Sequence, residues 1–164
     1  MAELRIDPAR DTDWDELWPI WHAIVATGDT YTYDPATTKD QARRQWLGDA
    51  GAEVWVARLD GSAVGLYKIA PNQAGPGSHV VNGSYMVSSA TRGNGVGRAM
   101  VEHSLARAAE LGYHGVQFNA VAATNVNAIG LYERLGFRTI GVVPDGFRHP
   151  EQGFVDLLIM YRPL

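Results

Sequence analysis

Seven consecutive residues near the middle of the chain have the types and spacing of an anion-binding turn. They lie between a predicted strand and a predicted helix and are Arg92, Gly93, Asn94, Gly95, Val96, Gly97 and Arg98. The glycines let the backbone approach a ligand without a Cβ in the way. The helix that follows offers unpaired N–H groups and the positive end of its dipole, and Arg98 adds a cation. This glycine turn therefore predicts a site for a phosphate or pyrophosphate.

Three known patterns of glycine turn compete with a solvated turn whose glycines are incidental. A P-loop requires Lys-Ser or Lys-Thr after its last glycine, and no such pair follows these glycines. A dinucleotide-binding fingerprint requires Gly-x-Gly-x-x-Gly, and from Gly93 its third glycine position falls on Arg98. The third pattern, Arg-x-x-Gly-x-Gly, is met by Arg92, Gly95 and Gly97.

A second motif lies one predicted strand further along the chain. Residues 125–137 read Asn-x-x-Ala-x-x-Leu-Tyr-Glu-x-x-Gly-Phe. Together with the Arg-x-x-Gly-x-Gly turn, and in the same order, this segment resembles the acyl-CoA-binding motifs of the GNAT superfamily of N-acetyltransferases. The resemblance covers almost the whole chain. It implies a GNAT-like α/β fold, in which a splayed mixed sheet has helices on both faces and acetyl-CoA lies where two central strands part.

The same resemblance assigns roles to residues around the expected acetyl-CoA. Backbone groups near Met86, Val87 and Ser88 are expected to pair with the pantetheine arm, much as an added strand would. A bulge in that strand would free an N–H that polarises the thioester carbonyl. Tyr132 matches the family's usual general acid, which protonates the departing thiolate. Three amides are expected beside the thioester and the pantetheine, namely Asn119, Asn125 and Asn127.

Tyr132 and Asn125 also have purely structural interpretations. Tyr132 shares a predicted helix face with Leu131 and Leu135, where it could be a core tyrosine whose hydroxyl bonds to backbone. Asn125 stands where a helix N-cap is expected, and this role is compatible with ligand binding. Both interpretations stay open on the sequence alone.

The acceptor amine has no motif of its own in this sequence. The segment 29–35 is rich in Tyr and Asp, and it either lines an amine pocket or covers an edge of the core. Five residues are expected to bind the acceptor: Tyr31, Tyr33, Asn82, Tyr85 and His149. An alkylammonium has a pKa near about 10.4, so it must lose a proton before it attacks the thioester. By position, the candidates for the general base are Tyr85, Asn82, Asn119, Asp34, His149 and Asp156.

Hydrophobic alternation and turn residues predict the strands that position these groups. Strands are expected at residues 4–6, 53–59, 63–69, 79–87, 115–121, 137–143 and 154–161. Asp60-Gly61 predicts a tight hairpin, and residues 144–153 are expected to form a turn-rich loop. The strands at 79–87 and 115–121 should be parallel neighbours, because a helix connects them.

Four helices are predicted from apolar periodicity and capping residues. The first carries Trp14, Trp18 and Trp21 on one face and should kink or split at Pro19. The others are expected at residues 38–47, 96–111 and 125–135. The helix at 96–111 should bury Leu111 and leave His103 on the surface.

Composition limits the kinds of protein that this chain can be. Its 164 residues fit a single domain over 1–164, and hydrophobic and charged shares of 46% and 20% are typical of globular proteins. With no cysteine, disulfides and thiolate chemistry are excluded, and a reducing cytoplasm is the expected location. A net charge of −4 without a basic cluster argues against a nucleic-acid partner. No membrane span, signal peptide or metal cofactor is expected.

These observations predict an acetyl-CoA-dependent N-acetyltransferase whose acceptor is the primary amine of a small molecule or amino-acid-like substrate. The amine would attack the thioester directly, with Tyr132 as general acid. Two alternatives remain: a CoA-binding sensor without chemistry, and an acetyltransferase of protein N-termini or lysines. A protein acceptor would need an open groove rather than a closed pocket. A homodimer is considered as the assembly.

Overall fold

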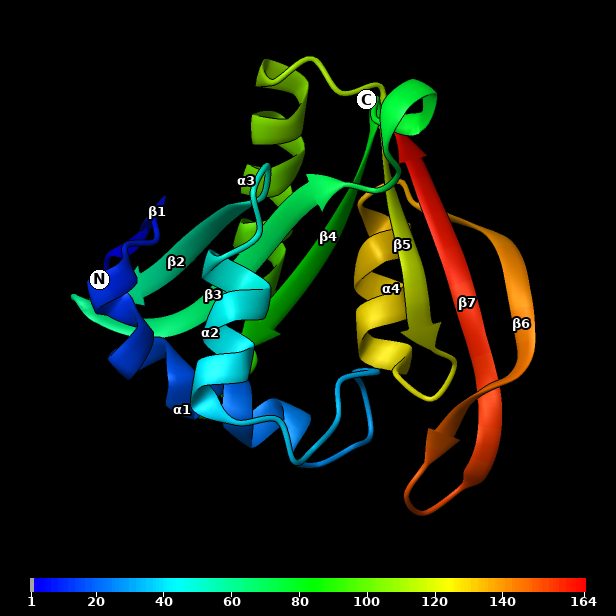
Figure 1. The fold of residues 1–164 in the computed structure, drawn as a ribbon, viewed down its shortest axis with the longest axis horizontal. Coiled ribbons are helices and arrows are strands. Elements are labelled where there is room, and N and C mark those ends of the chain that lie inside the picture. Colours follow the sequence, from blue (N-terminus) through cyan, green and yellow to red (C-terminus); the bar gives the residue numbers. More distant parts are fainter. Residues whose placement is uncertain (1) are drawn as a thin grey trace.

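In the computed structural model, the described residues 2–164 form one seven-stranded mixed sheet and four α-helices (Figure 1). The strand order across the sheet is β1-β2-β3-β4-β5-β7-β6. The strands are β1 Leu4–Pro8, β2 Glu53–Leu59, β3 Ser62–Pro71, β4 Val80–Val87, β5 Gly115–Ala122, β6 Arg138–His149 and β7 Gly153–Pro163. The helices are α1 Trp14–Val25, α2 Lys39–Leu47, α3 Val96–Glu110 and α4 Val126–Arg134, with short 3₁₀ turns η1 Asp11–Asp13, η2 Gly75–Gly77 and η3 Ser89–Thr91. The predicted mixed α/β sheet, its seven strands and the four helices are confirmed.

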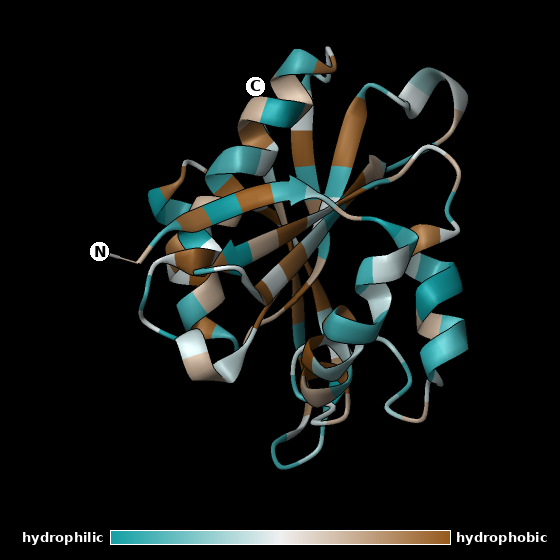
Figure 2. Ribbon diagram, turned by 90° about the vertical axis from the view of Figure 1, so that its left-hand side faces the viewer, coloured by the Kyte–Doolittle hydropathy of each residue, from teal (hydrophilic) through white to brown (hydrophobic). Residues whose placement is uncertain are grey.

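Helices pack on both faces of the sheet, because side chains alternate between the two faces along each strand. On one face, α1 and α2 bury Trp21 and Trp46 against Met86 of β4. On the other, α3 and β5 bury Met100 and Phe118 in a second core that α4 also joins. Hydrophobic positions, brown in Figure 2, recur along the central strands. Two apolar layers therefore hold β4 and β5 in place.

The two central strands pair over only a short length and then diverge. β4 runs antiparallel to β3 from Val81 to Val87 in one continuous register. Its parallel pairing with β5 ends at Asn82, opposite Gln117, and Figure 1 shows the strands separating beyond that point. The predicted parallel neighbours and the implied splay are thus confirmed. The splay leaves the β5-facing edge of β4 free for another partner.

Local sequence explains the hairpin and the C-terminal ribbon. Asp60 and Gly61 have φ of 49° and 85°, the left-handed pair that a two-residue hairpin requires. The prediction of a loop at 144–153 is wrong in part, because β6 continues to His149. The register with β7 shifts between Val143 and Phe147, so a bulge absorbs the intervening residues. A proline is tolerated there because β6 is the edge strand of the sheet.

Three expectations about helices are corrected. α1 runs unbroken through Pro19, whose missing N–H removes one helical bond on the exposed side of the helix. Leu111 lies just beyond the end of α3 and is 43% exposed rather than buried. His103 is half-buried, and its Nδ1 lies 2.7 Å from the Tyr67 hydroxyl, because this part of α3 packs over β3.

Candidate acyl-CoA site

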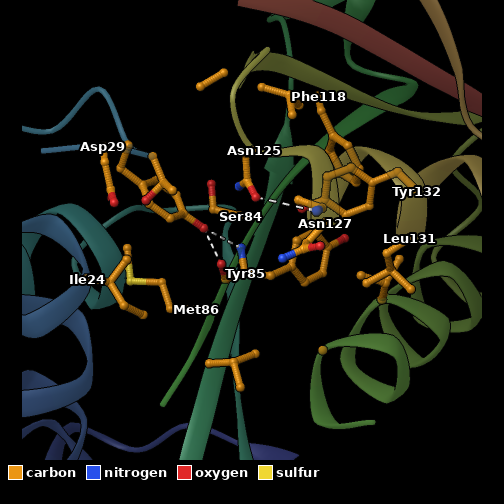
Figure 3. Close-up of a pocket in the computed structure, with 18 of the residues that line it drawn as sticks. Ile24, Asp29, Ser84, Tyr85, Met86, Phe118, Asn125, Asn127, Leu131 and Tyr132 are labelled. Carbon is orange, nitrogen blue, oxygen red and sulfur yellow. Dashed lines mark hydrogen bonds between the residues drawn. The ribbon is translucent and has the colours of Figure 1, made fainter. Parts of the chain in front are cut away.

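A cavity of about 1320 Å³ opens where β4 and β5 part (Figure 3). It is lined by the glycine turn, the edge of β4, the start of α3, α4 and the loop after α1. Of the residues predicted to bind acetyl-CoA or the acceptor, all except Asn94 line this cavity. The fold therefore gathers residues from both sequence motifs and from the acceptor loop in one place.

The glycine turn presents backbone N–H groups at one end of the cavity. Gly93 and Gly95 have φ of 84° and 76°, and open space lies where a Cβ would be on each. Such left-handed backbone is costly for residues other than glycine. The Ala99 N–H bonds to the Gly95 carbonyl at 2.9 Å as the first turn of α3 closes. The N–H groups that precede it in the helix consequently point out of the helix end, as an anion site requires.

The arginines beside the turn differ in their surroundings. Arg92 is exposed at the end of η3 and lines the cavity. Arg98 also lines the cavity, but its Nε donates to Glu102 Oε1 at 2.8 Å, one turn further into α3. The expected cation at Arg98 is therefore already paired with a carboxylate. The backbone N–H groups are freer than Arg98 to donate hydrogen bonds to an anion.

Open backbone groups on β4 come from the splay rather than from a bulge in that strand. The Val80 carbonyl accepts from the Asn72 N–H, and the Ser88 N–H donates to the Val64 carbonyl. The backbone N–H and C=O groups of even-numbered β4 residues therefore point toward β3. Tyr85 and Val87 therefore direct their N–H and C=O groups into the cavity. The expected bulge lies in β5 instead, where the register with β7 shifts between residues 118 and 121.

Tyr132 projects from α4 into the cavity opposite β4 (Figure 3). Its ring packs against Phe118 with centroids 4.5 Å apart and lies 6.4 Å from the Tyr85 ring. Burial raises the pKa of the Tyr132 hydroxyl to about 12, so the group keeps its proton at neutral pH. The ring packs against the core, as the structural interpretation predicts, and the side chain also lines the cavity, as the proton-donor interpretation requires.

Asn125 caps α4 at the same end of the cavity. Its Oδ1 accepts from the Ala128 N–H at 3.4 Å, a long cap bond. This leaves the Nδ2 donor of Asn125 for a ligand, and Asn127 lies exposed beside it (Figure 3). The predicted N-cap is confirmed.

Tyr31 reaches from the loop after α1 to the open edge of β4. Its hydroxyl donates to the Tyr85 carbonyl and accepts from the Tyr85 N–H at 3.1 Å. The ring stacks on Tyr33 with centroids 5.9 Å apart, and Tyr33 in turn packs on Trp21. Both tyrosines therefore join the acceptor loop to the hydrophobic core and line the cavity, as predicted for a pocket.

The hydroxyl of Tyr85 forms a hydrogen bond inside the core, so it is a poor candidate for the general base. Ser104 Oγ donates to the Val101 carbonyl at 2.7 Å, so Tyr85 must donate its proton to Ser104 Oγ, also at 2.7 Å. Burial raises the pKa of the Tyr85 hydroxyl well above its ordinary value. Tyr85 therefore contributes backbone groups to the cavity rather than a titrating side chain.

The side chain of His149 likewise forms hydrogen bonds within a turn. Its Nδ1 accepts from the N–H groups of Glu151 and Gln152 at 3.2 and 3.1 Å. Because both partners are donors, Nδ1 carries no proton and Nε2 is left as a donor. His149 lines the cavity, as predicted, but this tautomer disfavours it as a base.

The positions of the carboxylates near the site change which residues can be the general base. Asp34 accepts from Ala36 N–H and Asp156 accepts from Asp145 N–H, and neither lines the cavity, so both drop out. Among residues 2–164, Asp29 is the one carboxylate in the cavity wall. The composition of segment 29–35 pointed to an amine pocket, but Asp29 itself was not among the predicted site residues.

A smaller polar recess of about 190 Å³ adjoins the cavity near the splay. Asn82 and Asn119 lie between the two spaces, and Asn82 Nδ2 donates to the Gln117 carbonyl at 3.0 Å where pairing ends. Asp49 and Lys68 form an ion pair of 2.6 Å in the recess wall. Asp49, Lys68 and Ser84 are not among the predicted site residues, because their proximity depends on the tertiary fold. Pairing of β3 with β4 places Lys68 opposite Ser84, and Asp49 reaches Lys68 from the segment after α2.

Residues 2–164 contain neither a metal-site arrangement nor a helix that could span a membrane. In that part of the chain, no group of His, Cys, Asp and Glu has the arrangement of a metal site. None of the helices described there has the length and apolarity needed to cross a membrane.

Comparison with known proteins agrees with this geometry. The model of the Acetyltransferase (GNAT) family matches residues 14–137, which include both motifs and the cavity-lining segments of β4 and α4. The chain belongs to the GNAT family. The family predicted from the glycine turn and the Asn125 helix is thereby confirmed.

Individual GNAT relatives show how far the similarity extends. A solved structure of a GCN5-related N-acetyltransferase from Kribbella flavida is 43% identical, with a TM-score of 0.94 and 98% of each chain covered. N-acetyltransferase aca1 of Schizosaccharomyces pombe is 38% identical over 99 residues, which are 60% of this chain and 47% of that protein. The peptidyl-lysine N-acetyltransferase YjaB of Escherichia coli is 30% identical over 144 residues, 84% of each. This chain thus spans about half the length of the S. pombe relative and most of the Kribbella flavida and E. coli proteins.

Proposed function

We propose that this GNAT protein transfers the acetyl group of acetyl-CoA to the amine of a small, amino-acid-like molecule. One observation carries the proposal. A glycine turn with outward N–H groups, an unpaired strand edge and a protonated tyrosine line the same cavity. The turn suits an anion, the strand edge suits an extended arm with amide groups, and the tyrosine suits a thiolate leaving group. A CoA thioester contains all three.

The residues present fit acetyl-CoA. The glycine turn and the start of α3 would hold the pyrophosphate, since their N–H groups face outward. The amide groups of the pantetheine arm would pair with the open edge of β4 near Val87, as an added strand does. Asn125, whose Nδ2 is free for a ligand, would bind the same arm from α4.

Groups on opposite sides of the cavity would share the acyl transfer. An amine must be unprotonated to attack, and Asp29 supplies a carboxylate that attracts an ammonium and accepts its proton through water. The Tyr85 N–H on the open edge would stabilise the negative charge that develops on the carbonyl oxygen. Tyr132 would give its proton to the leaving sulfur, which has a pKa near about 8.5 by analogy with cysteine.

The polar recess supports an amino-acid-like acceptor. It shares Asn82, Ser84 and Asn119 with the cavity, so one ligand can extend into both. Lys68 and Asp49 neutralise each other there, and the other side chains in the wall are amides and hydroxyls apart from Ala70 and Pro71. Such a wall favours an acceptor whose second group is a carboxylate or amide bound by neutral donors.

Direct measurement of acetyl transfer tests the proposal. Purified protein, acetyl-CoA and a panel of amino acids, amino-acid amides and simple amines would be assayed for release of free thiol. Turnover that is highest for acceptors with an amine next to a carboxylate or amide is expected. CoA binding without transfer to any acceptor would favour the sensor alternative, and absence of CoA binding would refute the proposal.

Lysine acetylation is a second candidate, favoured by the name of the E. coli relative. A lysine side chain lacks a neighbouring carboxylate, so it would leave the recess unfilled. The panel therefore includes Nα-blocked lysine and a lysine peptide, and faster turnover of these would replace the small-molecule acceptor. A cytoplasmic location and a homodimer stay predictions, and light scattering would measure the latter.

A further inference from the structure

The hydroxyl of Tyr31 occupies both backbone groups that Tyr85 presents on the open edge of β4. It donates to the Tyr85 carbonyl and accepts from the Tyr85 N–H (dashed lines beside Tyr85 in Figure 3). A neighbouring strand would use these same two groups. The phenol therefore replaces one residue of the strand partner that β4 loses at the splay.

The loop after α1 holds Tyr31 in this position. Gly28, with φ of 67°, turns the chain out of α1, and the Thr27 hydroxyl bonds to the Ile24 carbonyl at 2.6 Å. The Tyr31 ring then lies on Tyr33 and against the core between α1 and the sheet. Burial, with smaller contributions from Tyr132 and Tyr33, raises the Tyr31 pKa well above its ordinary value. A neutral hydroxyl can donate and accept at once, as this site requires.

Tyr85 is where the reacting carbonyl would meet the protein. Under the proposed function, the pantetheine arm leaves the glycine turn after β4 and runs back along the open edge. Val87 is the first open-edge residue on this path, and Tyr85 is the next, roughly 6.6 Å further on. The Tyr132 ring lies 6.4 Å from the Tyr85 ring across the same gap. Tyr132, the proposed proton donor, and Tyr31, which holds the Tyr85 N–H, therefore line the same cavity.

We infer that Tyr31 is a positioning residue that competes with the thioester carbonyl for the Tyr85 N–H, and thereby sets the relative affinities of acetyl-CoA and CoA. This inference rests on the proposed function. CoA ends in a thiol without a carbonyl, so it binds while Tyr31 stays on β4. Acetyl-CoA gains the Tyr85 N–H only when the Tyr31 hydroxyl leaves it. The wild-type protein consequently binds acetyl-CoA less favourably, relative to CoA, than the open strand edge alone would allow.

The Tyr31→Phe variant removes this competition while keeping the ring. The dissociation constants of acetyl-CoA and CoA would be measured by calorimetry for both proteins. The ratio of the CoA constant to the acetyl-CoA constant is expected to rise about three- to ten-fold in the variant, the value of one net hydrogen bond. A structural role for Tyr31 alone would change both constants together and leave the ratio unchanged.

Tyr33→Phe is the matched control, since it removes a hydroxyl from the same loop without a bond to β4 and should leave the ratio as in wild type. Tyr31→Leu repeats the test if Tyr31→Phe lowers the melting temperature enough to prevent titration. An unchanged ratio overturns the inference, and a lower ratio shows that Tyr31 assists the thioester instead. If the wild type binds neither ligand, the proposed function fails and not only the role of Tyr31.

Discussion

At the scale of single residues, Tyr132 combines a packed ring with a hydroxyl that faces the cavity. Phe118 and Phe137 hold the ring at centroid distances of 4.5 and 5.8 Å. Tyr132→Phe keeps this packing and removes only the proton donor. Under the proposed function, kcat should fall on the order of 10²-fold while the acetyl-CoA dissociation constant changes little. Steady-state kinetics and calorimetry on the same preparation measure both quantities, and unchanged kcat would refute the acid role.

The raised pKa of Tyr132 gives this residue a pH signature. Burial moves the pKa to about 12, so the proton needed by the leaving group is present throughout pH 7 to 10. The pH profile of kcat should therefore show no alkaline fall from Tyr132 in that range. The same shift lowers stability between pH 10 and 12, where the unfolded tyrosine ionises and the folded one does not. A fall in kcat near pH 10 that Tyr132→Phe abolishes would contradict the assignment.

Asp29 is the carboxylate of the cavity wall, and its charge should matter more than its shape. Its Oδ1 lies 2.5 Å from the Thr27 hydroxyl, whose single proton it shares with the Ile24 carbonyl, and this contact orients the side chain. Asp29→Asn keeps the size but removes the charge that attracts the ammonium group, so kcat/KM for the amine should fall about tenfold or more. Asp34→Asn is the control, because Asp34 lies outside the cavity and caps the Ala36 N–H. Equal effects of the two variants would exclude a specific role for Asp29.

At the scale of elements, the glycines of the turn differ in how strongly the backbone requires them. Gly95 has φ of 76°, so Gly95→Ala should destabilise the fold by about 1–2 kcal/mol and weaken CoA binding by distorting the turn. Gly97 has no such φ, and a Cβ there would meet Val87 and Leu131 at the ordinary distances of 3.6 and 3.9 Å. Gly97→Ala should therefore leave the melting temperature nearly unchanged. Comparable losses of stability in both variants would show that strain at Gly95 is not the cause.

Elements with strong local signals were predictable from sequence. The glycine turn, the Asp60-Gly61 hairpin and the α4 motif each depend on residues adjacent in the chain, so spacing alone places them. The predicted strand at 137–143 is shorter than β6, because Pro144 and Gly146 end the alternation of side chains. In the structure a bulge lets β6 continue past them. A bulge compensates a local irregularity through pairing with β7, and pairing partners are not encoded in the local pattern.

The site was predictable on its CoA side and less so on its acceptor side. Arg92, Gly95 and Asn125 lie within motifs, whereas Lys68 of β3 meets Asp49, in the segment after α2, only through the tertiary fold. The contact between Tyr31 and the Tyr85 backbone was also invisible, because it depends on a loop conformation and on a strand edge freed by the splay. Residues that act through long-range geometry leave no periodic signal in sequence.

At the scale of the whole molecule, two helical layers flank a sheet that is split between β4 and β5. α1 and α2 bind β4 on one face, while α3 and α4 bind β5 and β4 on the other, and the gap between the strands stays lined with polar backbone. An unpaired strand edge inside a protein is costly unless other groups bond to it. Tyr31 and Asn82 provide such bonds at the splay, so stability and ligand binding draw on the same backbone groups.

Acid should weaken this assembly through an ion pair that links the sheet to α3. Glu53 at the start of β2 accepts from Arg107 Nε and Nη2 at 2.9 and 2.8 Å, and both side chains are 31% exposed. The Arg107 hydrogen bonds hold the Glu53 pKa below its ordinary value of 4.5. A lowered carboxyl pKa contributes stability above pH 4.5 that is lost as the pH falls through the folded-state value.

Comparison of Glu53→Gln with wild type isolates this contribution. At pH 7 the variant should lose about 1 kcal/mol of unfolding free energy, because a partly exposed pair contributes less than a buried one. The difference should be smaller at pH 3, because this contribution to stability declines as the pH falls below 4.5 toward the lowered folded-state pKa. Glu133→Gln, on the exposed side of α4, is the control and should match wild type at both values. Urea titrations at the two pH values measure the differences, and a loss that persists undiminished at pH 3 would show that the Glu53 charge is not what links β2 to α3.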